Sequence, residues 1–116
     1  MQAGSAWQAR QNASSQLARR HARYLFSVPL AVRYLMPGGF RITRGMSVDI
    51  SEGGISAIVE ADLQIGETVG IDIPLKSGQL NTVAILRYHT SSRAGFEFLG
   101  LTMDERRQIA VAGRVS

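Results

Sequence analysis

The feature that most constrains the fold is a series of short segments in which apolar and polar residues alternate, separated by turn-forming residues. The first contains apolar side chains at every second position, the period that places them on one face of a β-strand: Val28, Leu30, Val32 and Tyr34. Strand-like composition recurs in five later segments, 40–50, 55–61, 68–75, 80–89 and 94–99. Residues 37–39, 52–54 and 76–78 contain the glycines and proline typical of turns. The sequence therefore predicts an all-β domain of about six short strands.

A closed sheet is the arrangement that best suits so small a domain, because closure removes the exposed strand edges at which chains aggregate. We therefore expect a six-stranded antiparallel β-barrel, with a sandwich of two sheets as the alternative. The end of the chain differs, because Thr102 and Glu105 have the spacing of a capping box at a helix start. We predict a short C-terminal helix through about Ala112, ended by Gly113. Three side chains are expected to pack it on the barrel: Met103, Ile109 and Ala110.

Charge is distributed unevenly along the chain. Residues 1–48 contain seven arginines and no acidic residue, whereas residues 49–116 contain six basic and nine acidic residues. Residues 1–18 are poor in apolar side chains, and we expect a flexible N-terminal tail there, with the folded domain at 19–116. Arginine supplies twelve of the thirteen basic side chains, and its planar guanidinium matches phosphate groups and guanine edges. The N-terminal part is therefore expected to meet an anionic partner.

Several classes of protein are excluded by composition. The chain has no cysteine and two isolated histidines, so we expect neither a disulfide framework nor a metal site. No apolar run approaches the roughly 20 residues of a membrane-spanning helix, and the N-terminus lacks the apolar core of a secretory signal. We therefore expect a cytoplasmic protein without membrane insertion, metal or cofactor.

Two clusters of polar residues are candidates for a binding site. Arg19, Arg20 and Arg23 lie within five residues, directly before the first strand. They form either a solvated basic patch or a clamp in which guanidinium groups converge on an anion. The second cluster, Asp49-x-Ser51-x-x-Gly54, comes at the end of the second strand.

Each residue type of the second cluster has a possible binding role. Asp49 and Ser51 share one face if the strand stays extended, and a carboxylate there can accept from guanine N–H groups. Gly54 is expected to offer a positive φ and a close backbone approach. The alternative is a β-turn stabilised by the Asp or Ser side chain, without a binding role.

Together, the pattern Arg19-x-x-x-Arg23 followed by Asp49-x-Ser51-x-x-Gly54 resembles the signature of PilZ domains, small bacterial receptors for the second messenger cyclic di-GMP. The resemblance covers about residues 17–112. It extends to the segments 86–88 and 94–98 and to the C-terminal helix. It implies a β-barrel receptor whose N-terminal arginine loop orders over the ligand and which signals to a downstream effector protein.

The resemblance also implies a role for each motif residue. Arg19 and Arg23 correspond to the arginines that bind phosphate and the guanine Hoogsteen edge, and Arg20 between them is a possible helper. Asp49 and Ser51 correspond to the pair that contacts base and phosphate, and Gly54 to the turn glycine. Tyr88 stands where tryptophan is frequent in the family, and either stacks on a guanine or packs at the rim. Three other arginines, Arg33, Arg41 and Arg44, are expected to be barrel-surface charge.

Three alternative functions stay open. A small β-barrel with a basic arm can bind single-stranded nucleic acid, although the aromatic content of 7% and the acidic barrel portion argue against it. A protein-interaction module without a ligand is a second alternative, which the intact motif disfavours. An enzyme is the least favoured, because Asp49 and Ser51 have no partner that suggests a catalytic triad, and we assign no catalytic residue.

Overall fold

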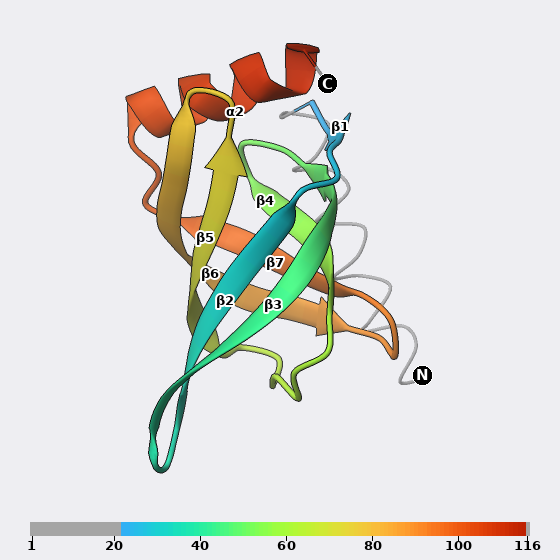
Figure 1. Ribbon diagram of the computed structural model, residues 1–116, viewed down its shortest axis with the longest axis vertical. Helices are drawn as coiled ribbons and strands as arrows, with labels where there is room; N and C mark the ends of the chain where they lie inside the picture. Colours follow the sequence, from blue (N-terminus) through green and yellow to red (C-terminus); the bar gives the residue numbers. More distant parts are fainter. Residues whose placement is uncertain (1–21, 116) are drawn as a thin grey trace, which may run out of the picture.

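The computed structural model describes residues 22–115 and consists of a β-barrel with a helix packed across one end (Figure 1). The last element is the helix α2 (Met103–Val115). The strands in chain order are β1 (Tyr24–Leu25), β2 (Pro29–Met36), β3 (Gly39–Ile50), β4 (Gly54–Val59), β5 (Thr68–Leu75), β6 (Gly78–His89) and β7 (Ala94–Leu99). The predicted tail 1–18, together with Arg19 and Arg20, lies outside the described residues.

The sheet closes through its longest early strand. Hydrogen bonds join the strands in the order β1-β3-β2-β5-β6-β7-β4, and β3 also pairs with β4. All pairings are antiparallel, with residues 39–46 of β3 against β2 and residues 45–50 against β4. Strands β2 to β7 thus form the predicted six-stranded antiparallel barrel. The two-residue strand β1 adds to β3, with Leu25 opposite Asp49; it was not predicted, since two residues carry no periodicity.

The alternating side chains fill the barrel as the sequence predicts. Leu30 and Val32 of β2 point inward, and Ile71, Ile73 and Leu86 from β5 and β6 are fully buried with them. Burial of such side chains contributes about 1.5–3 kcal/mol each, which makes the interior the main source of stability. The strand predicted at 55–61 instead spans Gly54–Val59, and the remaining strand ends differ from the prediction by two residues or fewer.

The C-terminal helix begins as predicted and ends later. Glu105 N–H donates to Thr102 Oγ1 at 3.1 Å, and Thr102 N–H donates to Glu105 Oε1 at 2.9 Å, which is a capping box. The helix continues through Gly113 to Val115, since one glycine in a helix costs only about 1 kcal/mol. Ile109 and Ala112 are buried against the barrel, whereas Met103, predicted to pack there, is 74% exposed at the first helical position.

A hairpin formed by β2 and β3 extends beyond the barrel wall (Figure 1). Within the described residues, β2 pairs with β5 over residues 31–33, so the rest of the ribbon is held by its own two strands. Gly39 at its turn has a φ of 122°, a conformation that glycine adopts easily. Leu35 and Phe40 are cross-strand partners near the tip, and both are largely exposed. The apolar tip of this hairpin therefore contributes nothing to the interior.

Candidate functional site

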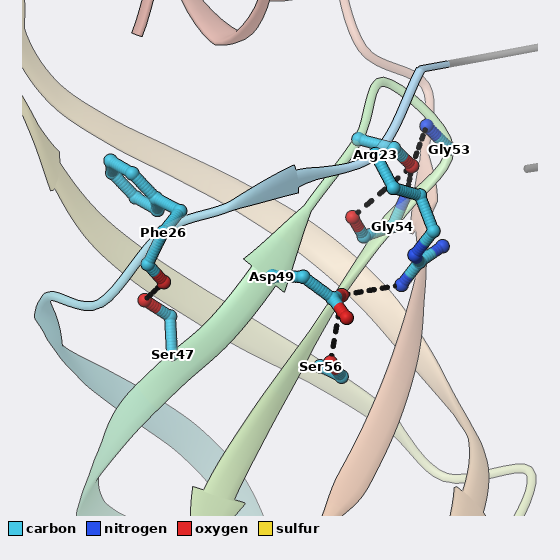
Figure 2. A network of polar contacts seen from close by, with 8 residues as sticks. Arg23, Phe26, Ser47, Asp49, Gly53, Gly54 and Ser56 are labelled. Atoms are coloured by element: carbon cyan, nitrogen blue, oxygen red, sulfur yellow. Dashed lines mark hydrogen bonds and ion pairs between the residues drawn. The ribbon is translucent and has the colours of Figure 1, made fainter. Parts of the chain in front are cut away.

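Arg23 of the first cluster and Asp49 of the second meet at one edge of the barrel. Arg23 lies directly before β1, and Asp49 is the penultimate residue of β3. Arg23 Nη2 lies 2.7 Å from Asp49 Oδ1, and the hydroxyl of Ser56 donates to the same oxygen at 2.8 Å (Figure 2). Both partners of the ion pair are partly exposed. Two residues that the sequence pattern assigned to one site, 26 positions apart, are therefore in direct contact.

A buried serine fixes the segment that carries Arg23. The hydroxyl of Ser47 donates to the carbonyl of Phe26 (Figure 2) and accepts from the N–H of Val28 at 2.8 Å. The N–H of Phe26 donates to the carbonyl of Val48 at 3.1 Å. These bonds hold the chain between β1 and β2 against β3, and so place Arg23 beside Asp49.

Asp49 and Tyr88 belong to one row of residues that crosses the outside of four strands. In the register of the sheet, Asp49 is opposite Ser56, Ser56 is opposite Gly95, and Gly95 is opposite Tyr88. A Cβ atom added to Gly95 would lie 2.0 Å from Cε1 of Tyr88, so the tyrosine ring lies directly over this glycine. The tyrosine ring can occupy this position only because residue 95 has no side chain.

Two irregularities of the sheet precede these two side chains. The pairing of β3 with β4 shifts between Ser47 and Asp49, and that of β6 with β7 shifts between Leu86 and Tyr88. Such shifts are typical of β-bulges, which redirect the following side chains and are frequent beside functional sites. Arg87 lies at the second shift, and its Nε donates to Glu97 Oε1 at 2.6 Å. Neither Arg87 nor Glu97 was a predicted site residue.

Ser51 stabilises a turn, as the alternative interpretation of this motif predicts. Its hydroxyl accepts from the N–H groups of Gly53 at 3.1 Å and Gly54 at 3.2 Å, and the side chain is buried. Because β3 ends at Ile50, Ser51 belongs to the turn and not to the strand that contains Asp49. The Ser51 hydroxyl shapes the turn beside the pocket described below.

Gly54 is required for close packing and not for a positive φ. Its φ is not among the positive values, so that expectation is wrong. A Cβ atom at this position would lie 2.2 Å from the carbonyl oxygen of Phe96 on β7. Glycine therefore allows the 51–54 turn to lie against β7, and the predicted close backbone approach at this position is present.

These elements surround a pocket of about 240 Å³. Four predicted residues line it: Arg23, Ser51, Gly54 and Tyr88. Asp49 adjoins it through its bond to Arg23, while Arg19 and Arg20 are outside the described residues. The charged lining also includes four residues that were not predicted, Glu52, Arg87, Glu97 and Arg106. The guanidinium groups of such a lining can bind phosphate or other anions, and its carboxylates can accept hydrogen bonds from the N–H groups of a base.

Two further findings concern other kinds of site. Within residues 22–115 there is no group of three or more His, Cys, Asp or Glu side chains placed to hold a metal ion. No helix in this part of the chain is both long and apolar enough to cross a membrane.

Comparison with known families and structures gives a consistent result. The family model described as the PilZ domain matches residues 17–111. The PilZ domain of YcgR from Escherichia coli, solved with c-di-GMP, superimposes with a TM-score of 0.67 at 22% identity, over 84% of this chain and 89% of that one. The PilZ domain of CeSA from a cellulose-synthesizing bacterium gives 0.61 at 21% identity, over 80% and 95%.

A larger protein shares the same fold over part of its length. The motility inhibitor MotI of Bacillus subtilis matches with a TM-score of 0.64 at 19% identity, over 84% of this chain and 50% of that one. No curated protein matches the sequence.

Proposed function

The chain belongs to the PilZ domain family, and we propose that it is a receptor that binds cyclic di-GMP at the pocket beside the 51–54 turn. PilZ domains are receptor domains without catalytic activity. The similar domain of YcgR was solved with this ligand, which supports the proposal. A receptor for a bacterial second messenger acts in the cytoplasm, and we propose that location for this chain.

The observation that carries the proposal is the contact between Arg23 and Asp49 at the edge of the pocket. A guanidinium can donate to a phosphate or to guanine O6 and N7, and a carboxylate can accept from guanine N1–H and N2–H. Asp49 uses Oδ1 for both of its bonds, and Oδ2 has no donor within the described part of the chain. Arg23 likewise has further N–H groups. The pair can therefore receive a guanine nucleotide while its two partners stay close.

The other predicted residues have places in this proposal. Arg19 and Arg20 join Arg23 in binding the phosphates, and the N-terminal arginine loop orders over the bound ligand. Tyr88 stacks on a guanine, and the turn formed by Ser51 and Gly54 gives the ligand close access to the backbone. The ordered loop then presents a changed surface to a downstream effector protein.

Titration calorimetry on the full chain tests this function. We expect stoichiometric binding of cyclic di-GMP, weakened about tenfold or more in Arg23→Ala, because a charge-assisted contact is lost. A single-stranded oligonucleotide, titrated at two salt concentrations, tests the nucleic-acid alternative. Binding of the oligonucleotide alone, with a steep decrease of affinity as salt increases, would contradict the proposed receptor function.

A further inference from the structure

The pocket receives one charged side chain from the C-terminal helix, which no part of the PilZ signature in this sequence includes. Arg106 lines the pocket together with Arg23 and Arg87, although it comes from α2 and they come from the barrel side. The capping box at Thr102 fixes the start of the helix, and the Arg106 N–H donates to the Thr102 carbonyl at 3.0 Å, closing the first turn. The buried side chain of Ile109, one turn further, holds this part of the helix on the barrel.

Ion pairing distinguishes Arg106 from the other two arginines of the pocket. Arg23 is paired with Asp49 at 2.7 Å, and Arg87 with Glu97 at 2.6 Å. Arg106 forms no ion pair with any residue between 22 and 115. A guanidinium forms its strongest hydrogen bonds with anionic groups. Arg106 is therefore the guanidinium of the lining that no carboxylate of the described residues pairs with.

The charges of the lining residues also distinguish Arg106. Three arginines face two glutamates, Glu52 and Glu97, so the described lining has a net charge of one positive unit. Without Arg106, the two signs would balance. Asp49 at the pocket edge offsets Arg23, and Glu97 offsets Arg87, so Arg106 is the lining arginine whose charge attracts an anionic ligand without a paired carboxylate.

We infer that Arg106, on α2, forms an anion subsite of the pocket that binds one phosphate of a cyclic dinucleotide. The inference rests on the proposed function and adds to it. A ligand with two phosphates has one for the Arg23 side and one for the helix. Binding then connects the barrel to α2, which also contacts β1 directly after Arg23.

The test compares Arg106→Ala with Arg107→Ala in the full chain. Arg107 is the neighbouring exposed residue of the same helix but does not line the pocket, so both variants remove one equal charge. In calorimetric titrations with cyclic di-GMP, we expect Arg106→Ala to weaken binding about tenfold and Arg107→Ala to change it less than about threefold. Arg106→Lys, which keeps the charge but not the planar fork, should be intermediate.

A measurement on the unmodified chain provides an independent readout. In ¹⁵N NMR spectra that detect arginine side chains, the Nε–H signal of Arg106 should shift as cyclic di-GMP is added, whereas that of Arg107 should stay in place. Equal affinities of the two alanine variants, together with an unshifted Arg106 signal, would overturn the inference while wild-type binding upholds the proposed function. Absence of wild-type binding would overturn both.

Discussion

Two ion pairs with nearly equal partial exposure differ in where they lie, and this makes the role of Asp49 testable at the level of one residue. The side chains of Arg23 and Asp49 are 39% and 24% exposed, and those of Arg33 and Asp72 are 43% and 23% exposed. The first pair lies at the pocket, and the second lies on the β2–β5 wall, outside the pocket lining. Exposed pairs of this kind contribute about 0–1 kcal/mol to stability.

We therefore expect Asp49→Asn and Asp72→Asn to lower the free energy of unfolding by similar small amounts, up to about 1 kcal/mol. Only Asp49→Asn should weaken binding of cyclic di-GMP, by about tenfold or more, because an amide presents one acceptor oxygen in place of a carboxylate. Urea unfolding measures the first quantity and calorimetry the second. The assignment of Asp49 to the site fails if the two variants bind the ligand equally well.

Gly54 permits a second prediction at the same scale. In Gly54→Ala the new methyl group would lie 2.2 Å from the Phe96 carbonyl oxygen, a backbone atom that moves only with its strand. We expect a loss of about 1–3 kcal/mol in the free energy of unfolding, as for other overpacked sites. Gly38→Ala is the control, because its added Cβ would be 3.7 Å from Arg41, an ordinary contact distance. Equal stability of the two variants in urea unfolding would show that β4 and β7 separate easily.

At the scale of elements, the β2–β3 hairpin is the clearest case of apolar sequence without a core role. Phe40 is 75% exposed, whereas Leu86 on β6 is fully buried. We expect Phe40→Ser to change the free energy of unfolding by no more than about 0.5 kcal/mol. Leu86→Ala should lower it by about 2–5 kcal/mol, because it leaves a cavity. If thermal unfolding showed a large loss for Phe40→Ser, the hairpin would have to pack on the barrel in solution.

The helix start gives a second prediction for an element. Thr102→Ala removes the acceptor for the Glu105 N–H, and such changes cost about 1 kcal/mol. Thr102→Ser keeps the hydroxyl and should retain most of the stability. Circular dichroism during thermal unfolding measures both. A Thr102→Ala variant as stable as wild type would indicate that Ile109 and Ala112, and not the cap, determine where α2 sits.

The sequence predicted the elements better than their irregularities, for a physical reason. Alternation extends over many residues, so the strands around Val32 and Ile71 could be located within two residues of their ends. A bulge changes the pairing at one position and leaves no periodic signal. The motif named Asp49 and Tyr88 as candidates. Their common row across Ser56 and Gly95 could not be predicted, because both residues follow such shifts in the pairing.

At the scale of the whole molecule, the candidate site is assembled from segments far apart in the chain. Arg23 comes from the first described segment, the 51–54 turn from the β3–β4 connection, and Arg106 from the last helix. Family resemblance predicted the first two, because they belong to one signature. Arg106 and the Arg87–Glu97 pair depend on how the helix and strands pack in three dimensions, and no spacing in the sequence specifies this.

This assembly leads to a prediction for the chain as a whole. A ligand that contacts Arg23, the 51–54 turn and Arg106 joins both ends of the chain through the barrel, and it should stabilise the folded state by mass action. At a free ligand concentration of one hundred times Kd, the stabilisation is about 2.7 kcal/mol.

The N-terminal arginine loop should contribute its own signal, because residues 17–24 contain three arginines that the proposal assigns to the ligand. We expect hydrogen exchange of residues 17–24 to slow when cyclic di-GMP is added to the full chain, and the melting temperature to rise. Arg23→Ala at the same ligand concentration is the control and should show neither effect in full. If the melting temperature rises while exchange at 17–24 is unchanged, the ligand binds the barrel and the arginine loop does not order over it.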